Sequence, residues 1–232
     1  MKAAIMQPYF LPYIGYFQLI NAVDVFVVYD DVNYIKKGWI NRNNILVNGE
    51  GFLFNIPLQE VSQNKSINQI NIEENTNWKK NILKTITLSY KKAPYFVQVF
   101  PIIEKIIALE EKNLAKFITY SLIEICNFLS IETTILISSS IEKNNDLKGQ
   151  DKIIEICKKN EANSYINAIG GMNLYDKDVF LKCGISLNFI QSNPIFYSQF
   201  KNEFIPWLSI IDVMMFNPPE QIRDFLSQYD LI

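Results

Sequence analysis

Short apolar runs alternate along this chain with longer amphipathic stretches, a pattern typical of α/β domains. The first run, Lys2 to Met6, predicts a strand, and the run from Val25 to Tyr29 predicts a second one. Between them, a loop dense in proline and aromatic residues crosses Pro12 to Gly15, and a helix is expected from there to about Asn21. The chain therefore opens with a predicted β-α-β unit.

The middle of the chain changes character twice. Residues 40–72 are predicted to be rich in β-structure, with a hairpin that turns at Gly49 to Gly51, whereas residues 78–129 are predicted to be a helical insertion. The stretch IETTILIS, which begins at Ile131, is β-branched and predicts a strand. The charged, asparagine-rich segment from Glu142 to Lys148 is the best candidate for a mobile loop.

Helices and strands then alternate to the end of the chain. We expect a helix at 152–160, a strand at 164–169, a Gly170-Gly171 turn that opens a helix through Cys183, a strand at 185–191, and closing helices at 204–216 and 218–229. There is no repeat and no clear interdomain linker. The prediction is a single α/β domain over residues 1–232, with a mostly parallel sheet flanked by helices.

Composition narrows the class of protein. The 22 basic and 24 acidic residues give a net charge of −2, which argues against sequence-independent binding of nucleic acid. No apolar run is long enough to predict a membrane span, and no signal peptide is visible, so a cytoplasmic protein is expected. The three cysteines are far apart and form no CxxC pair, which predicts no metal site.

The chain contains no histidine. This excludes Ser-His and Cys-His nucleophiles and histidine-ligated zinc, and it removes the side chain best suited to proton transfer near neutral pH. Cys126 and Cys157 lie on apolar faces of helical patterns, so they are expected in the core. Catalysis would depend on carboxylates, tyrosines, lysines, backbone dipoles or a base carried by the substrate.

In open α/β sheets, ligands bind outside the carboxyl ends of the strands, which directs attention to the first loop. Gln7 follows the first strand, and Tyr13-x-Gly15-Tyr16 stands at the start of the first helix. This layout is similar to the HxGH signature of nucleotidylyltransferases, with tyrosines where the histidines would stand. A phenol donates a hydrogen bond but carries no positive charge, so the alternatives are a modified nucleotide pocket and an aromatic-packed turn.

Asp30 and Asp31 end the second predicted strand. Two neighbouring carboxylates in a partly buried site should raise the pKa of one of them, which would favour abstraction of a proton from an amine or hydroxyl. Because side chains alternate along a strand, only one of the two should face the pocket. The alternative is a turn in which an aspartate caps a helix.

Three further segments are candidate binding elements. Arg42 offers a fork of donors for phosphate or carboxylate, and Trp39 can stack on a base or sugar. The Gly170-Gly171 turn follows a strand, where backbone amides can hold an anion, and Asp212 interrupts the apolar stretch WLSIIDVMMF. The complete set of predicted ligand-binding residues is Gln7, Tyr13, Gly15, Tyr16, Trp39, Asn41, Arg42, Asn43, Gly170, Gly171, Tyr175, Gln199 and Asp212.

The segments MQPYFLPYIGYFQLI, DDVNYIKKGWINRN, YKKAPYF, the turn from Gly170 to Tyr175, and FIPWLSIIDVMMFN occur in this order, and together they resemble the WbqC-like family over essentially the whole chain. The resemblance implies a role in bacterial O-antigen or other surface-polysaccharide synthesis and a glycine transferase activity. Members carry a histidine-proline before a Tyr-x-Gln element, whereas this chain has Ser192-Asn193-Pro194. If that histidine is catalytic in other members, this chain either uses a different base or lacks the activity.

We expect an acyl- or aminoacyl-transferase that acts on a nucleotide-linked amino sugar and takes its acyl group from an activated donor. Asp30 or Asp31 would be the base, Arg42 would hold a phosphate, and Trp39 and Tyr16 would pack on a base or sugar. The alternatives are a nucleotidylyltransferase-like enzyme and a non-catalytic sugar-nucleotide-binding protein. The sequence names no cofactor and leaves a homo-oligomer open.

Overall fold

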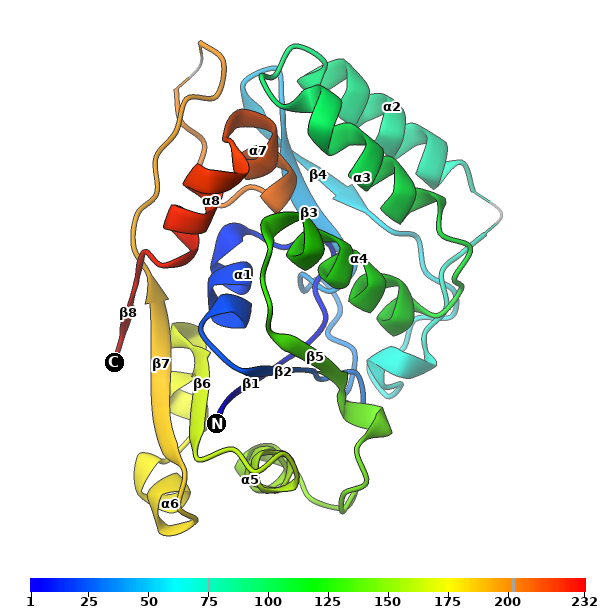
Figure 1. Ribbon diagram of the computed structural model, residues 1–232. Helices are drawn as coiled ribbons and strands as arrows, with labels where there is room; N and C mark the ends of the chain where they lie inside the picture. The colour runs from blue at the N-terminus through cyan, green and yellow to red at the C-terminus, as the bar shows by residue number, and fades with distance from the viewer. Residues whose placement is uncertain (75, 202) are drawn as a thin grey trace.

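The computed structural model describes residues 1–74, 76–201 and 203–232 (Figure 1). A six-stranded sheet forms its centre, and all neighbouring strands in it are parallel except the last pair, β7 and β8. In spatial order the strands are β5 (Thr134–Ile137), β2 (Val25–Val28), β1 (Lys2–Met6), β6 (Ser164–Ala168), β7 (Ser186–Ser192) and β8 (Tyr229–Leu231).

If the six strands of this sheet are numbered by their order along the chain, their spatial order across the sheet is 3-2-1-4-5-6. This is the order of doubly wound dinucleotide-binding folds, in which the chain begins at the centre, builds one half outward and then returns to build the other. The direction of building reverses between β1 and β6. Ligands of such folds bind at that point, outside the carboxyl ends of the two strands.

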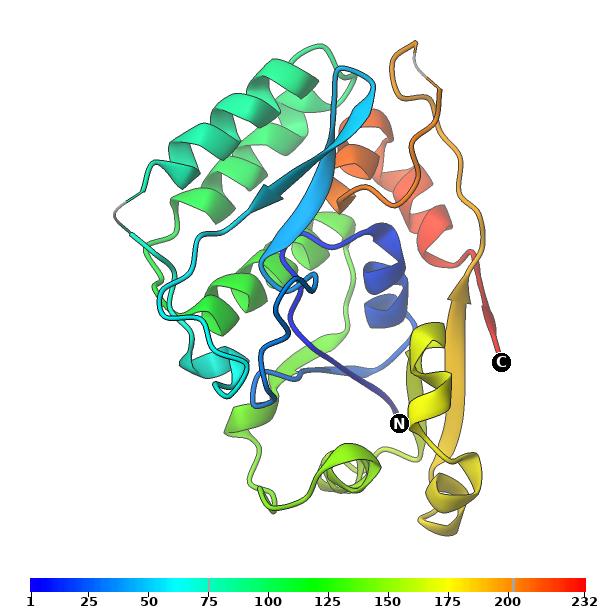
Figure 2. The same ribbon diagram turned by 180° about the vertical axis from the view of Figure 1, so that it is seen from behind.

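Helices cover both faces of the sheet (Figures 1 and 2). Because successive strand residues point to opposite faces, Ala4 of β1 packs with α1 and α4, whereas Ala3 and Ile5 pack with α5 and α6. The first layer contains α1 (Ile14–Asn21), α4 (Leu114–Leu129) and α8 (Pro219–Leu226), and the second contains α5 (Gly149–Lys159) and α6 (Lys177–Lys182).

A long insertion lies between β2 and β5. It begins with an antiparallel hairpin and continues into helices that pack on one another. The hairpin consists of β3 (Arg42–Val47) and β4 (Glu50–Asn55), and the helices are α2 (Trp78–Tyr90), α3 (Phe96–Ala108) and α4. A late helix, α7 (Ile210–Phe216), packs against α3 and β3. Within the described residues, three short 3-10 turns complete the elements: Ile67–Gln69, Ser138–Ser140 and Ile169–Leu174.

The predicted fold class is confirmed, because the sheet is mostly parallel and helices flank it. Some elements differ from the prediction. The helix expected over 204–216 begins only at Ile210, since Pro206 and the left-handed backbone of Trp207 (φ 62°) prevent a helix there. The last helix, expected to reach Tyr229, ends at Leu226, and Tyr229 begins the strand β8. The Gly170-Gly171 turn is itself a 3-10 turn that precedes α6.

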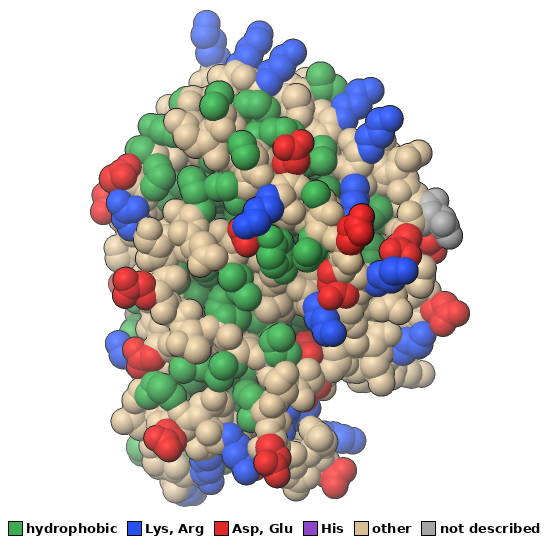
Figure 3. All heavy atoms as spheres, turned by 45° about the vertical axis from the view of Figure 1, so that its right-hand side comes forward, with side chains coloured by type: hydrophobic (Ala, Val, Ile, Leu, Met, Phe, Trp, Pro, Cys, Tyr) green, Lys and Arg blue, Asp and Glu red, His purple; other side chains and the backbone are tan. Residues whose placement is uncertain are grey.

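On the face shown in Figure 3, acidic and basic side chains are interspersed, and a group of basic side chains gathers at its upper edge. None of the described helices combines the length and the apolarity needed to cross a membrane. Within the same residues, no three His, Cys, Asp or Glu side chains come close enough together to hold a metal ion.

Candidate functional site

A cavity of about 440 Å³ opens where the strand order reverses. We call it the switch-point cavity, since its walls come from the carboxyl end of β1, the carboxyl end of β6, the first turns of α1 and the turn after β6. Its lining residues are Ile5, Met6, Gln7, Tyr9, Tyr13, Gly15, Tyr16, Leu19, Tyr29, Ile35, Asn167, Ala168, Gly170, Gly171, Leu174 and Tyr175.

The N-terminus of α1 forms one wall of this cavity. No side chain caps it, and the N–H of Tyr16 already donates to the carbonyl of Tyr13, so the N–H groups of Ile14 and Gly15 are those that an anionic or carbonyl ligand could use. Gly15 makes room for the ring of Tyr13, because a Cβ at this position would lie 2.3 Å from that ring. The Tyr16 hydroxyl donates a 2.8 Å hydrogen bond to the carbonyl of Gln7 and thereby ties the helix to the loop after β1.

The opposite wall depends on Asn167, the second-last residue of β6. Its Oδ1 accepts a 2.9 Å hydrogen bond from the N–H of Ala168, and its Nδ2 lies against Gly171, where a Cβ would stand only 2.3 Å away. The Asn167 amide is thus held by a hydrogen bond on one side, and on the other side it has room only because Gly171 has no side chain. Gly170 has open space around it and is not constrained in this way.

Five tyrosines line the switch-point cavity, and none of its described lining residues is charged at neutral pH. Burial raises the pKa of Tyr13, Tyr29 and Tyr175, and a hydrogen bond with the Ser192 hydroxyl opposes the effect at Tyr13. The phenols therefore stay protonated and serve as donors, acceptors and stacking surfaces. The cavity is suited to bind and orient a ligand rather than to take up protons.

Asp31 does not line the switch-point cavity. Its Oδ2 forms ion pairs with Lys143 at 2.9 Å and with Lys152 at 3.0 Å, and both lysine side chains are buried. Burial would raise the pKa of Asp31, but the Ser138 hydroxyl and the two ammonium groups lower it below its usual value. The raised pKa that we predicted for a base is not found at Asp31.

Asp30 is buried and does not line the cavity either. It accepts two hydrogen bonds from Ser139, one from the backbone N–H at 2.9 Å and one from the hydroxyl at 2.6 Å, so it fixes the turn after β5. The loop that we expected to be mobile is anchored through Lys143, which donates to the carbonyl of Ser138.

The polar residues around Arg42 hold the hairpin and its neighbouring loops together. Arg42 donates to the carbonyls of Gly38 and Lys37 and lies 5.6 Å from the ring of Trp39, which is partly exposed. Asn41 binds the carbonyl of Ile56. Asn43 donates to the carbonyl of Leu11 at 2.8 Å and fixes the aromatic loop that leads to α1. These four predicted residues, Trp39, Asn41, Arg42 and Asn43, do not line the switch-point cavity.

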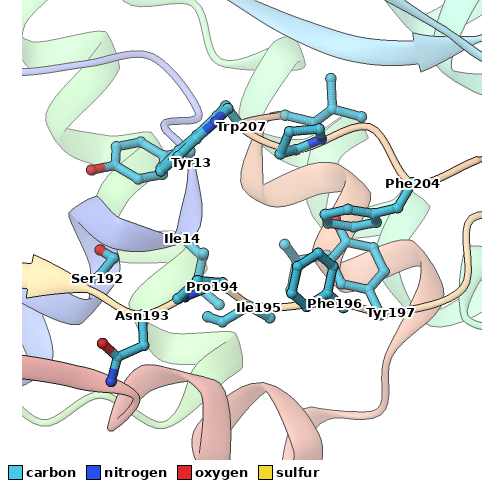
Figure 4. A pocket seen from close by; sticks show the side chains of 13 residues that line it. Tyr13, Ile14, Ser192, Asn193, Pro194, Ile195, Phe196, Tyr197, Phe204 and Trp207 are labelled. Carbon is cyan, nitrogen blue, oxygen red and sulfur yellow. The ribbon is translucent and has the colours of Figure 1, made fainter.

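A second cavity of about 410 Å³ lies beside the first and shares Tyr13 with it (Figure 4). We call it the apolar cavity, because aromatic and aliphatic side chains make up most of its walls. They come from α1, from the loop after β7 and from α7: Tyr13, Ile14, Ser192, Asn193, Pro194, Ile195, Phe196, Tyr197, Phe204, Pro206, Trp207, Leu208 and Val213.

Asp212 supports the apolar cavity from inside the protein. It is fully buried and accepts hydrogen bonds from the hydroxyls of Tyr90 (2.8 Å) and Tyr197 (2.7 Å) and from Nε2 of Gln199 (2.7 Å). Burial raises the pKa of Asp212, and these three donors oppose the effect. Gln199 also bonds both backbone groups of Ile205, so the network closes the loop that carries the cavity wall.

The structure divides the predicted ligand-binding residues into two groups. The first group lines the switch-point cavity: Gln7, Tyr13, Gly15, Tyr16, Gly170, Gly171 and Tyr175. The second group does not: Trp39, Asn41, Arg42, Asn43, Gln199 and Asp212. Sequence reasoning did not assign Tyr29 or Asn167 to the site, although each stands at a strand end, the signal that had identified Gln7. The contribution of Trp207 was missed because its segment was predicted to be helical.

Comparison with known proteins gives a family and one relative. The chain matches the WbqC-like protein family over residues 7–224. It is 26% identical over 227 residues to an uncharacterized protein of Mycobacterium tuberculosis, and the alignment covers 97% of each chain. No solved structure matches it.

Proposed function

This chain belongs to the WbqC-like protein family, and we propose that it is a transferase that places an acyl or aminoacyl group on the amine of a nucleotide-linked amino sugar. The surface-polysaccharide role, such as O-antigen synthesis, is part of the proposal and rests on the resemblance described above. One observation carries the binding step: the switch-point cavity coincides with the point of reversal in a doubly wound sheet.

The switch-point cavity has groups that suit such a ligand. The uncapped N-terminus of α1 can receive phosphate oxygens, the tyrosine rings can stack on a base or sugar face, and the amides of Gln7 and Asn167 can recognise polar edges. This arrangement needs no cationic side chain, because backbone N–H groups supply the positive potential.

In the proposed reaction the amine nitrogen of the sugar attacks the carbonyl carbon of the donor. An N–C bond forms, the bond from that carbon to the leaving group breaks, and the proton of the amine passes to the leaving group. The described lining holds no carboxylate or lysine, so the contribution of the chain is to bind and orient the two reactants.

A melting experiment tests the binding step. Nucleotides, nucleotide-linked sugars and nucleotide-linked amino sugars are compared as ligands. A compound that binds only the native state stabilises it, by about 2.7 kcal/mol when the free ligand concentration is 100 times Kd, and so raises the melting temperature. We expect the nucleotide-linked sugars and amino sugars to give a larger increase than the nucleotides alone, because the tyrosine rings and the amides of Gln7 and Asn167 can also contact the sugar. Equal melting temperatures with and without every such compound would contradict the proposal.

A second candidate is nucleotidyl transfer, which the position of Tyr13-x-Gly15-Tyr16 favours, since it lies at the start of α1 and lines the cavity. Release of pyrophosphate from a nucleoside triphosphate would support this activity. Binding of a nucleotide-linked sugar without any turnover would instead indicate a sugar-nucleotide-binding protein.

A further inference from the structure

The apolar cavity is lined at one end by packed aromatic rings that are incompletely covered. The ring of Phe204 lies 5.3 Å from that of Phe196 and 5.1 Å from that of Tyr197. Phe196 and Trp207 border the same hollow, yet they are 72% and 71% exposed. Apolar surface gathered around a hollow in this way is typical of a ligand-binding groove, because an apolar ligand would remove the rings from water.

The other end of the apolar cavity is polar. Figure 4 shows the Tyr13 hydroxyl, the Ser192 hydroxyl and the Asn193 amide at this end, away from the rings of Phe196 and Phe204. None of the described lining residues is charged, so a carboxylate or ammonium head would lose hydration without gaining an ion pair. A suitable ligand has an apolar tail and a neutral, hydrogen-bonding head.

The polar end also adjoins the switch-point cavity. The ring of Tyr13 lines both cavities, packs over Gly15 on one side and lies 5.7 Å from Trp207 on the other. A carbonyl group held near Ser192 would therefore be next to the contents of the switch-point cavity. No other described residue lines both hollows.

We propose that the apolar cavity binds the acyl chain of a thioester donor, with the carbonyl at the polar end, where Trp207 packs on Tyr13, and an aliphatic tail along the rings of Phe196 and Phe204. This inference rests on the proposed acyl transfer and specifies its donor: the transferred group is an extended apolar acyl group rather than a glycyl group. The sugar nitrogen attacks the thioester carbon, the C–S bond breaks, and the departing sulfur takes the proton of the amine.

The test uses N-acetylcysteamine thioesters of increasing chain length, from acetyl to decanoyl, with affinity measured by calorimetry on the intact protein. We expect Kd to fall about fourfold for each added methylene, the ratio that corresponds to ~0.8 kcal/mol of transfer free energy, until the cavity is filled. The carboxylic acid of the same length should bind more weakly than the thioester. Affinity that does not change with chain length, or glycyl and decanoyl thioesters of equal Kd, would overturn the inference.

Two variants locate the binding. Phe196→Ala should weaken the decanoyl thioester at least tenfold without unfolding the protein, because its ring is mostly exposed in the free protein. Phe52→Ala removes an equally large, partly exposed ring from β4, outside both cavities, and should leave Kd unchanged. If both variants bind as tightly as wild type, the tail does not lie in the apolar cavity.

The outcome is separable from that of the proposed function. Nucleotide-sugar binding that persists while thioester affinity is independent of chain length would remove the donor assignment alone. Chain-length dependence without any nucleotide-sugar binding would remove the acceptor assignment alone. If Phe196→Ala lowers the oligomeric mass in sedimentation and leaves thioester affinity intact, the cavity is a contact between protein chains, and the inference fails.

Discussion

Replacement of Gly171 by alanine should deform the switch-point cavity, whereas the same replacement at Gly170 should not. A Cβ at Gly171 would lie 2.3 Å from Nδ2 of Asn167 and 3.2 Å from its Cγ, so the amide would have to retreat by roughly 1 Å to reach an ordinary contact. That movement would break the 2.9 Å hydrogen bond that Asn167 accepts from the N–H of Ala168. A partly buried N–H left without a partner costs about 1–3 kcal/mol.

Gly170→Ala is the matched control, because nothing lies within 4 Å of a Cβ at Gly170. Both variants gain about 0.4–1 kcal/mol from the lower entropy of the unfolded chain, and this gain cancels when the two are compared. At roughly 2–4 °C per kcal/mol for a chain of this size, Gly171→Ala should melt several degrees below Gly170→Ala in a thermal scan. Relative to wild type, Gly171→Ala should also show a smaller ligand-induced increase with the nucleotide-linked amino sugar. Equal melting temperatures, to within about 1 °C, would refute the constraint on Asn167.

Three further predictions concern buried groups. Asp31→Asn should lower the free energy of unfolding by about 3 kcal/mol at neutral pH, because it leaves two buried ammonium groups without their partner. The pKa of Asp31 is lowered from 3.8 in the folded protein. In denaturant titrations the difference from wild type should therefore stay constant above about pH 4 and shrink as pH falls below it. Asp212→Asn should destabilise the protein by about 1–3 kcal/mol through lost hydrogen bonds. Because the pKa of Asp212 is raised in the folded protein, its ionisation makes the free energy of unfolding fall as pH rises above 3.8, and the variant should lose this pH dependence. A variant whose free energy of unfolding changes with pH as in wild type would contradict this. A thiol reagent added to the native protein should modify Cys183, whereas Cys126 and Cys157 should react only on unfolding, because burial raises the pKa of both buried thiols to about 12. Rapid modification of all three thiols in the native protein would contradict the fold.

The sequence was most informative where function depends on position along a strand. The alternation of apolar runs predicted β1, α1 and β2, and the rule that ligands bind at the carboxyl ends of strands led to Gln7, Tyr13, Gly15 and Tyr16, which line one cavity. These residues are neighbours in the chain, so a local pattern contains the information.

The acidic pair shows why the rest could not be predicted. Asp30 and Asp31 stand at a strand end just as Gln7 does, but the groups that bind them come from residues more than a hundred positions later: Ser139 binds Asp30, whereas Lys143 and Lys152 bind Asp31. A lysine in a charged loop has no local feature that marks it as a buried partner. Strand order is equally invisible in the sequence, and it is the strand order that places β6 beside β1.

A similar limit applies to the apolar cavity. Phe204 and Trp207 stand in an apolar stretch that resembles the start of a helix, and only the backbone at Trp207 and the clamp of Gln199 on Ile205 turn that stretch into a cavity wall. The Asp212 network that holds the wall joins α7 to Tyr90 of α2 across 122 positions of sequence.

The position of a bound nucleotide-linked amino sugar tests the central claim most directly. A crystal structure of the protein soaked with UDP-glucosamine should show the ligand between the carboxyl ends of β1 and β6, with its phosphates at the N-terminus of α1 and contacts to Asn167 and Gly171. Density for the ligand elsewhere, for example at the Asp31 and Lys152 ion pair, with an empty switch-point cavity would contradict the account.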